Sequence, residues 1–162
     1  MIRPTVPDDT SELVAIARET GVFKPLELVA LREVLDDYHA KEHAQGHRSV
    51  TYEQDGRPIA FAYYAPAAMA DRAWYLYWIA VARTIQARGI GGRLLVAAED
   101  EIKGLGGRLF LIETSSLPHY EPTRRFYARH GYAVVSRLAD FYADGDDLVV
   151  FGKRFLPPEP SR

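Results

Sequence analysis

The stretch WYLYWIAV occupies residues 74–81, and the glycine-rich run QARGIGG follows at residues 86–92. The first stretch is apolar or aromatic on both faces of an extended chain, which is typical of a central strand covered on each side. After the glycines, apolar residues recur on one face of a predicted amphipathic helix: Leu94, Leu95, Ala98, Ile102 and Leu105. A glycine turn between a strand and a helix lets backbone N–H groups converge at the helix's positive end, so the stretch predicts an anion site.

Two familiar glycine motifs are excluded by their spacing. A dinucleotide-binding G-x-G-x-x-G needs a third glycine where Leu94 stands. A nucleotide triphosphate loop needs Lys and then Ser or Thr after its last glycine, but Arg93 and Leu94 follow Gly92. A tight turn that uses glycine only for its dihedral angles remains an open interpretation at this point.

The remaining elements follow from periodicity and turn residues. Strand, helix and strand between residues 74 and 112 predict a parallel crossover unit. Caps, prolines and glycines predict helices over residues 10–20, 25–44 and 122–131, and alternation predicts strands over 49–52, 59–64, 109–112, 132–142 and 148–155.

Composition narrows the class of protein. The chain has 162 residues, a net charge of -2 and no cysteine, which predicts one compact domain without disulfides, thiolate metal sites or a cysteine nucleophile. The near-neutral charge argues against a large basic surface for nucleic acid. No apolar run approaches the roughly 20 residues that span a bilayer, so we expect a cytoplasmic protein without a membrane partner.

A second recurrent stretch, FYARHGY at residues 126–132, places an aromatic pair on the last predicted helix, before a glycine and a further aromatic. With Q-x-x-G-x-G at residues 86–91, this order and spacing resembles the GNAT superfamily of acyl-coenzyme A-dependent N-acetyltransferases, from about Trp74 to Phe155. The resemblance implies an α/β (α+β) fold whose mixed, centrally splayed sheet has about six to seven strands flanked by about four helices. It also implies a single N-acetyltransferase domain over residues 1–156, and the proline-rich tail at 157–162 is expected to fray.

The resemblance further implies acetyl-coenzyme A as co-substrate, with no metal. It places the strand backbone of Ile79, Ala80 and Val81 along the pantetheine arm, where the N–H of Ile79 or Ala80 is a candidate oxyanion donor. Thr123 and Tyr127 would lie near the sulfur. The backbone N–H groups from residue 88 to residue 93 and nearby side chains would meet the pyrophosphate, which involves Gln86, Arg88, Gly89, Ile90, Gly91, Gly92 and Arg93.

Two catalytic groups are predicted. Tyr127 matches the tyrosine that the family often uses as general acid toward the leaving thiolate. The carboxylate that many members carry before the strand-ending valine is replaced by Tyr75. Glu113 is therefore our first alternative for the base, because a carboxyl at a strand end beside an apolar layer would have a raised pKa. A solvated Glu113 and proton transfer through an ordered water both stay open.

The predicted function is transfer of an acetyl group from acetyl-coenzyme A to a primary amine by direct attack in a ternary complex. A non-catalytic acyl-coenzyme A sensor module and a protein N-terminal or lysine acetyltransferase remain alternatives. We expect a small-molecule or peptide amine at the first two helices and the acidic loop at residues 142–147, and a homodimer is an open expectation. The five histidines lack a metal motif and are predicted to be solvated: His39, His43, His47, His119 and His130.

Overall fold

The computed structural model describes residues 1–86 and 88–155, and in this part of the chain it has a seven-stranded mixed sheet and four α-helices. The strand order is β1-β2-β3-β4-β5-β7-β6, which confirms the predicted mixed α/β fold. The chain divides into two compact units, the first made of Met1–Ala65 and Tyr77–Ala98, the second of Pro66–Leu76 and the chain from Glu99 onward. Strand β4 (Ala73–Val81) and helix α3 (Ile90–Gly104) each contribute residues to both units. Ala87 of the predicted loop and the tail at 157–162 lie outside the described residues.

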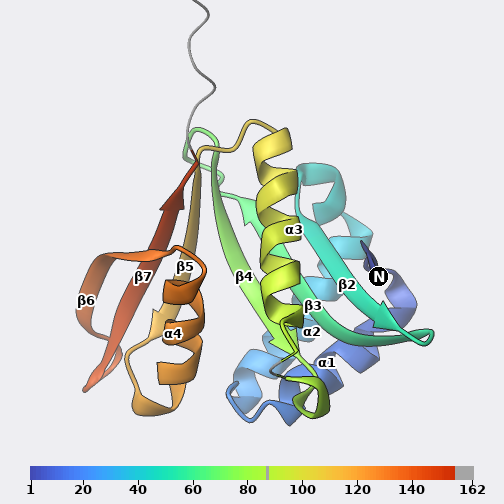
Figure 1. Ribbon diagram of the computed structural model, residues 1–162, viewed down its shortest axis with the longest axis horizontal. Coiled ribbons are helices and arrows are strands. Elements are labelled where there is room, and N and C mark those ends of the chain that lie inside the picture. Colours follow the sequence, from blue (N-terminus) through green and yellow to red (C-terminus); the bar gives the residue numbers. More distant parts are fainter. Residues whose placement is uncertain (87, 156–162) are drawn as a thin grey trace, which may run out of the picture. The chain divides into compact units, whose positions relative to one another are not determined.

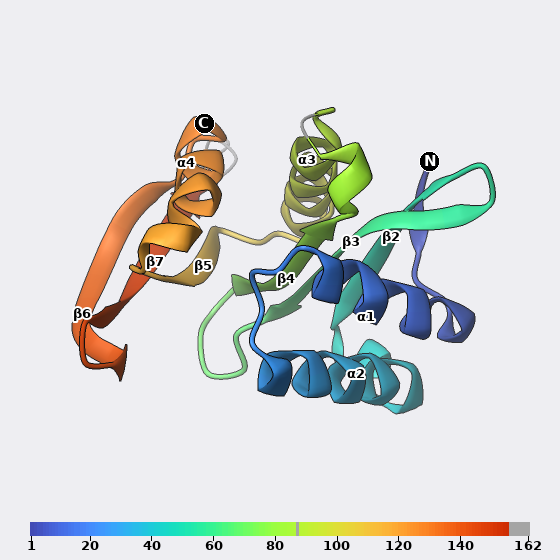
Figure 2. The same ribbon diagram turned by 90° about the horizontal axis from the view of Figure 1, so that it is seen from below.

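The first unit is a curved antiparallel sheet with helices on both faces. Strand β2 (Arg48–Gln54) pairs with β1 (Ile2–Pro4) and with β3 (Arg57–Pro66). Helices α1 (Thr10–Glu19) and α2 (Pro25–Ala40) lie together on one face of these strands, and the first part of α3 lies on the other (Figure 2). Their shared core holds side chains that are almost completely buried, among them Leu13, Leu31, Leu35, Phe61 and Ala80.

Helix α2 is shorter than predicted. It ends at Ala40, because Lys41 has φ -152° and leaves the helical region. A separate 3₁₀ turn, η2 (Glu42–Gln45), then carries the chain to Gly46, whose φ of 97° is left-handed. This break in the helix turns the following residues back toward the sheet.

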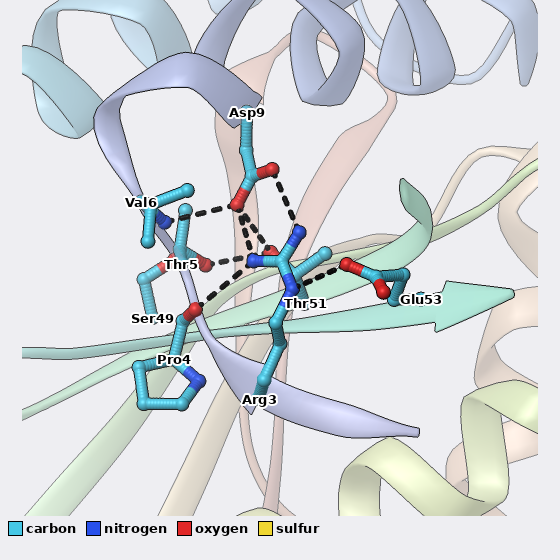
Figure 3. Close-up of polar contacts among 8 residues, drawn as sticks. All are labelled: Arg3, Pro4, Thr5, Val6, Asp9, Ser49, Thr51 and Glu53. Atoms are coloured by element: carbon cyan, nitrogen blue, oxygen red, sulfur yellow. Dashed lines mark hydrogen bonds and ion pairs between the residues drawn. The ribbon is translucent and has the colours of Figure 1, made fainter. Parts of the chain in front are cut away.

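The N-terminal strand β1 was not predicted, because three residues are too few to show alternation. A polar network fastens it (Figure 3): the Arg3 guanidinium donates to both Asp9 carboxylate oxygens at 2.7 and 3.0 Å and to Glu53 at 2.6 Å. Burial acts to raise the pKa of Asp9, but hydrogen bonds from Arg3 and from the Val6 N–H outweigh it and lower that pKa. The network thus ties the start of the chain to β2.

The second unit contains the other end of the sheet. Strand β5 (Leu109–Ser115) runs parallel to β4 from Ala73↔Leu109 to Leu76↔Ile112, which confirms the predicted crossover. Strand β7 (Asp146–Arg154) lies between β5 and β6 (Ala133–Ala143), antiparallel to both. Helix α4 (Glu121–Arg129) lies beside β5 and β7 (Figure 1).

A buried ion pair connects the end of α3 to this sheet. Glu99, 4% exposed, accepts hydrogen bonds from the Tyr132 hydroxyl at 2.9 Å and from Lys153 Nζ at 2.8 Å. Lys153 also donates to the His130 carbonyl at 3.1 Å. Burial, with the nearby Glu99 charge, raises the pKa of Tyr132, so its phenol remains a donor. Every buried charge in this group therefore has a partner.

Among the described residues, none of the helices has both the length and the apolar character needed to cross a bilayer.

Candidate functional site

The residues predicted along the pantetheine arm form the C-terminal end of β4. Ile79, Ala80 and Val81 all belong to the first unit, whereas the β4–β5 pairing given above uses only Ala73–Leu76. Ala80 is buried against the core of α1 and α2, and Ile79 and Val81 are half-buried. The strand is thus held by its own unit at the place where a ligand backbone is predicted to pair with it.

The loop after β4 is closed by Gln86, whose Nε2 donates to the Val81 carbonyl at 3.1 Å. Gly89 has φ +75°, a left-handed conformation in which a side chain would be strained, and α3 begins at the next residue, Ile90. The first helical bond given for α3 runs from Arg93 N–H to the Gly89 carbonyl at 3.1 Å.

This bond decides which donors are available. The N–H groups of Ile90, Gly91 and Gly92 precede it in the first turn, where a helix offers no acceptor to its own N–H groups. The predicted use of the Arg93 N–H for a ligand is wrong, because the helix already uses it. Three N–H groups at the positive end of a helix, two of them on glycines, are an arrangement that favours an anion.

Two arginines add positive charge near this end of α3. Arg88 is exposed, and Arg93 is exposed but donates from Nη1 to the Tyr52 hydroxyl of β2 at 3.0 Å. Both are close in sequence to the N–H groups of Ile90, Gly91 and Gly92. The loop therefore has the backbone geometry and the charge for a phosphate-like ligand.

Tyr127 lies in the second unit, on α4, and is only 5% exposed. The rings of Phe126, Tyr132 and Phe151 surround it at centroid distances of 5.5, 6.2 and 5.7 Å. Burial raises the pKa of Tyr127, which keeps the phenol protonated at neutral pH. Thr123 lies one turn earlier on the same helix and is half-buried.

Glu113 does not lie where the sequence predicted. Strand β5 continues to Ser115, so Glu113 is inside the strand, opposite Val150, and its side chain is exposed. The buried face of β5 carries the alternate residues Phe110, Ile112 and Thr114. The prediction that the Glu113 carboxyl lies in apolar surroundings is therefore wrong, and burial gives no reason to choose Glu113 as the base.

The acidic hairpin between β6 and β7 is largely paired within itself. Asp146 is buried and hydrogen-bonds the Ser115 hydroxyl. Asp147 accepts from the Asp140 N–H at 2.9 Å and from Arg137 at 2.8 Å, and these two contacts lower the pKa of Asp147. Carboxylates that are already paired have little charge left to attract a cationic amine, which weakens the predicted role of this loop.

A cluster of histidine and tyrosine side chains in the first unit was missed by the sequence. His47 Nδ1 lies 2.6 Å from the Tyr63 hydroxyl, and His47 Nε2 lies 3.4 Å from a Glu42 carboxylate oxygen. Nearby, the Nε2 atom of His39 is buried and has no partner among the described residues. The prediction that all five histidines are solvated is wrong for these two. No local motif marks either contact, since Tyr63 follows His47 by 16 positions.

In the described residues, no group of three or more His, Asp or Glu side chains is arranged to hold a metal.

Comparison with known proteins points to one family. The model of the acetyltransferase (GNAT) family matches residues 12–132. A crystal structure from Desulfovibrio desulfuricans, described as an acetyltransferase of the GNAT family, superposes with a TM-score of 0.92 at 33% identity, over 95% of this chain and 98% of that chain.

Two more distant structures share the fold. The aminoglycoside 6'-N-acetyltransferase from Enterococcus faecium has a TM-score of 0.78 at 19% identity, over 99% of both chains. A Salmonella typhimurium acetyltransferase solved with acetyl-coenzyme A has a TM-score of 0.79 at 17% identity, over 99% of this chain and 97% of that chain. A search of curated protein sequences found no match.

Proposed function

This chain belongs to the acetyltransferase (GNAT) family, and we propose that it transfers an acetyl group from acetyl-coenzyme A to a primary amine by direct attack in a ternary complex. The observation that carries the proposal is the start of α3. There a left-handed Gly89 is followed by the N–H groups of Ile90, Gly91 and Gly92, which have no acceptor within the helix.

The residues of the first unit fit the co-substrate. The three N–H groups and the Arg88 guanidinium would hold the pyrophosphate, and Gln86 would keep the loop closed through its bond to Val81. The backbone of Ile79–Val81 would pair with the pantetheine arm as with an added strand. Acetyl-coenzyme A supplies the acyl group as a thioester, which an amine attacks only when the amine is unprotonated.

The chain's own groups would act on charge and protons. The N–H of Ile79 or Ala80 would donate to the thioester oxygen as negative charge develops there. Tyr127, whose phenol stays protonated because burial raises its pKa, would give a proton to the leaving sulfur. Thr123 would contact the cofactor from the same face of α4. A lysine-like amine has a solution pKa of about 10.4, so the site must also accept a proton.

The loop assignment is tested with Gly91→Glu. A glutamate in the first turn of α3 favours the helix dipole, so the fold should be retained, but its charge opposes a pyrophosphate. Repulsion of about 1 to 4 kcal/mol between charges near 4 Å predicts a loss of coenzyme A affinity of at least about 5-fold. Isothermal titration with coenzyme A measures it. Gly104→Glu, at the other end of the same helix, is the matched control and should bind normally. Equal affinity of Gly91→Glu and wild type would refute the assignment.

Turnover separates the enzyme from a sensor module. Release of free coenzyme A is followed with acetyl-coenzyme A and a panel of kanamycin, spermidine, tyramine and a peptide with a free amino terminus. The panel spans small amines and peptides because the similar structures include aminoglycoside and ribosomal-protein-alanine N-acetyltransferases. Transfer to any member supports the proposal and distinguishes a small-molecule acceptor from a peptide. Tight coenzyme A binding without transfer to any member would favour the sensor module.

We also propose that the chain forms a homodimer through β6. This strand is at the edge of the sheet, paired only with β7 among the described strands. Its side chains include large apolar groups that are each more than half exposed: Val134, Val135, Leu138 and Phe141. An exposed edge strand with such side chains readily pairs with another chain.

A further inference from the structure

Three side chains of the first unit contact one another in a row: the Glu42 carboxylate, the His47 imidazole and the Tyr63 phenol. The turn η2 ends at Gly46, and the His47 N–H then donates to the Glu42 carbonyl at 3.1 Å. This closed turn brings His47 Nε2 to 3.4 Å from Glu42 Oε2. Because Ser49 pairs with Tyr63 in the β2–β3 register, Tyr63 lies beside the start of β2, with its hydroxyl 2.6 Å from His47 Nδ1.

The partners determine which nitrogen of His47 carries the proton. A neutral imidazole has one N–H donor and one acceptor nitrogen. Glu42 only accepts, so its contact at 3.4 Å favours the tautomer in which Nε2 carries the proton and Nδ1 accepts from the Tyr63 hydroxyl. Burial raises the pKa of Tyr63, and the Glu42 charge adds to this, so the phenol is a protonated donor. A proton that reaches Nδ1 produces an imidazolium next to a carboxylate, which stabilises it.

The cluster lies next to the part of β4 that carries the proposed oxyanion donor. The Tyr63 ring is edge-on to the Tyr77 ring at a centroid distance of 6.4 Å. Tyr77 is 54% exposed, although it lies on a strand in the interior of the sheet. Ile79 is two residues further along, which is about 7 Å at the usual rise of a strand. An amine that attacks a carbonyl at Ile79 would therefore lie against Tyr77, close to Tyr63.

We propose that Tyr63, His47 and Glu42 form the proton acceptor of the amine site. As the C–N bond forms and the C–S bond breaks, the nitrogen gives one proton to the Tyr63 oxygen, while Tyr63 passes its own proton to His47 Nδ1. The imidazolium is balanced by Glu42, the sulfur takes its proton from Tyr127, and exchange with solvent restores both groups. The inference rests on the acetyl transfer proposed above, and it supplies the base that Tyr75 and the exposed Glu113 leave unassigned.

Several charged and titratable groups face this relay and set its pH dependence. Glu42 and His43 come from η2, Asp37 and Tyr38 from α2, Tyr77 from β4, and the Arg48 guanidinium donates to the His47 carbonyl at 3.0 Å. The carboxylates Glu42 and Asp37 both act on Tyr63, where their charge adds to the burial that raises the pKa of its phenol. His43 contacts the ring of Tyr38 at 5.4 Å and belongs to the same turn as Glu42. It is therefore a matched control.

The test is the pH profile of kcat and kcat/KM for wild type, His47→Gln, Tyr63→Phe, Glu42→Gln and the control His43→Gln. The acceptor is the panel amine that wild type acetylates. We expect His47→Gln to lower kcat by at least about 100-fold across the profile, with the KM for acetyl-coenzyme A unchanged. Glu42→Gln should lower kcat less than His47→Gln, because the imidazole remains and only the carboxylate beside it is lost. His43→Gln should keep the wild-type profile.

The outcomes separate the two proposals. If His47→Gln and Tyr63→Phe both acetylate the amine with the wild-type kcat and pH profile, the relay is overturned while acetyl transfer stands. If wild type acetylates no amine of the panel, the proposed function fails and the relay fails with it. Coenzyme A affinity and thermal unfolding show whether each variant is folded. If His47→Gln or Tyr63→Phe does not fold, Glu42→Gln, which keeps the shape of its side chain, provides the test of the relay.

A measurement without an acceptor tests the proton positions. Nitrogen NMR of the imidazole at neutral pH should show His47 protonated on Nε2 and unprotonated on Nδ1. Tyr63→Phe should change the Nδ1 signal, whereas His43→Gln should leave it unchanged. A proton on Nδ1 in wild type would overturn the relay, because Tyr63 would then be the acceptor in that bond.

Discussion

Lys153→Met tests the buried ion pair on which α3, β7 and Tyr132 depend. Methionine keeps most of the aliphatic stem but removes the ammonium that donates to Glu99 at 2.8 Å and to the His130 carbonyl at 3.1 Å. Glu99 is 4% exposed and keeps only its bond from the Tyr132 hydroxyl. The variant leaves a carboxylate buried without its counter-charge, which costs about 3 to 5 kcal/mol.

Protonation sets an upper limit on that cost. A glutamate with a solution pKa of about 4.3 can be neutralised at pH 7 for about 2.7 × 1.36, or about 3.7 kcal/mol, and at pH 5 for about 1.0 kcal/mol. The ammonium also lies 5.3 Å from the centroid of the Tyr132 ring, a contact worth about 0.5 kcal/mol. We therefore expect the free energy of unfolding to fall by about 4 kcal/mol at pH 7 and by about 1.5 kcal/mol at pH 5.

Urea unfolding at 25 °C, followed by circular dichroism at both pH values, measures the loss for the variant relative to wild type. The double variant Glu99→Gln/Lys153→Met has no carboxylate to protonate, so its loss should be the same at pH 5 and pH 7. A loss by Lys153→Met that does not change with pH, or one below about 1 kcal/mol at pH 7, would show that Glu99 is hydrated and would refute the reasoning.

Three further outcomes are expected. Tyr127→Phe should lower kcat by about 100-fold without changing coenzyme A affinity, since only the donated proton is lost; an unchanged kcat would remove Tyr127 from the mechanism. Burial lowers the pKa of His39 in the fold, so the folded state binds fewer protons, and stability present above about pH 6.5 is lost as the pH falls. His39→Leu, which also removes the unpaired Nε2, should raise the melting temperature most at pH 5, whereas the exposed control His119→Leu should not. Leu138→Asp should convert the proposed dimer to a monomer by light scattering, and a wild type that is already monomeric would contradict that interface.

Local pattern was sufficient for most of the secondary structure. The strand at residues 74–81 and the helix after Gly89 could be predicted because burial and amphipathicity repeat with the period of the element itself. The elements that were missed or misjudged depend on a few residues. β1 has only three, and α2 ends where the backbone of Lys41 leaves the helical region, although residues 41–45 contain no glycine or proline to mark that end.

The candidate site divides in the same way. The sequence alone predicted the anion loop, because Gly89, Gly91 and Gly92 lie within four residues and their effect on the backbone is local. The start of α3 then decided which N–H groups lie in the first turn and have no acceptor within the helix, and the hydrogen bond from the Arg93 N–H marks where that turn ends. The position of Glu113 followed from which face of β5 is buried, and a strand's pattern does not reveal that when both faces carry apolar residues.

Only the tertiary structure decided the surroundings of His47 and Tyr63. Their contact depends on the turn at Gly46 and on the register that sets Ser49 opposite Tyr63. A shift of one residue in that register would turn Tyr63 to the opposite face of the sheet. The sequence by itself thus indicated the family, and it predicted the anion-binding loop because that prediction depends only on residues that are neighbours in the chain. The candidate base required the fold, because the turn at Gly46 brings Glu42 to His47 and the pairing of β2 with β3 brings Tyr63 to His47.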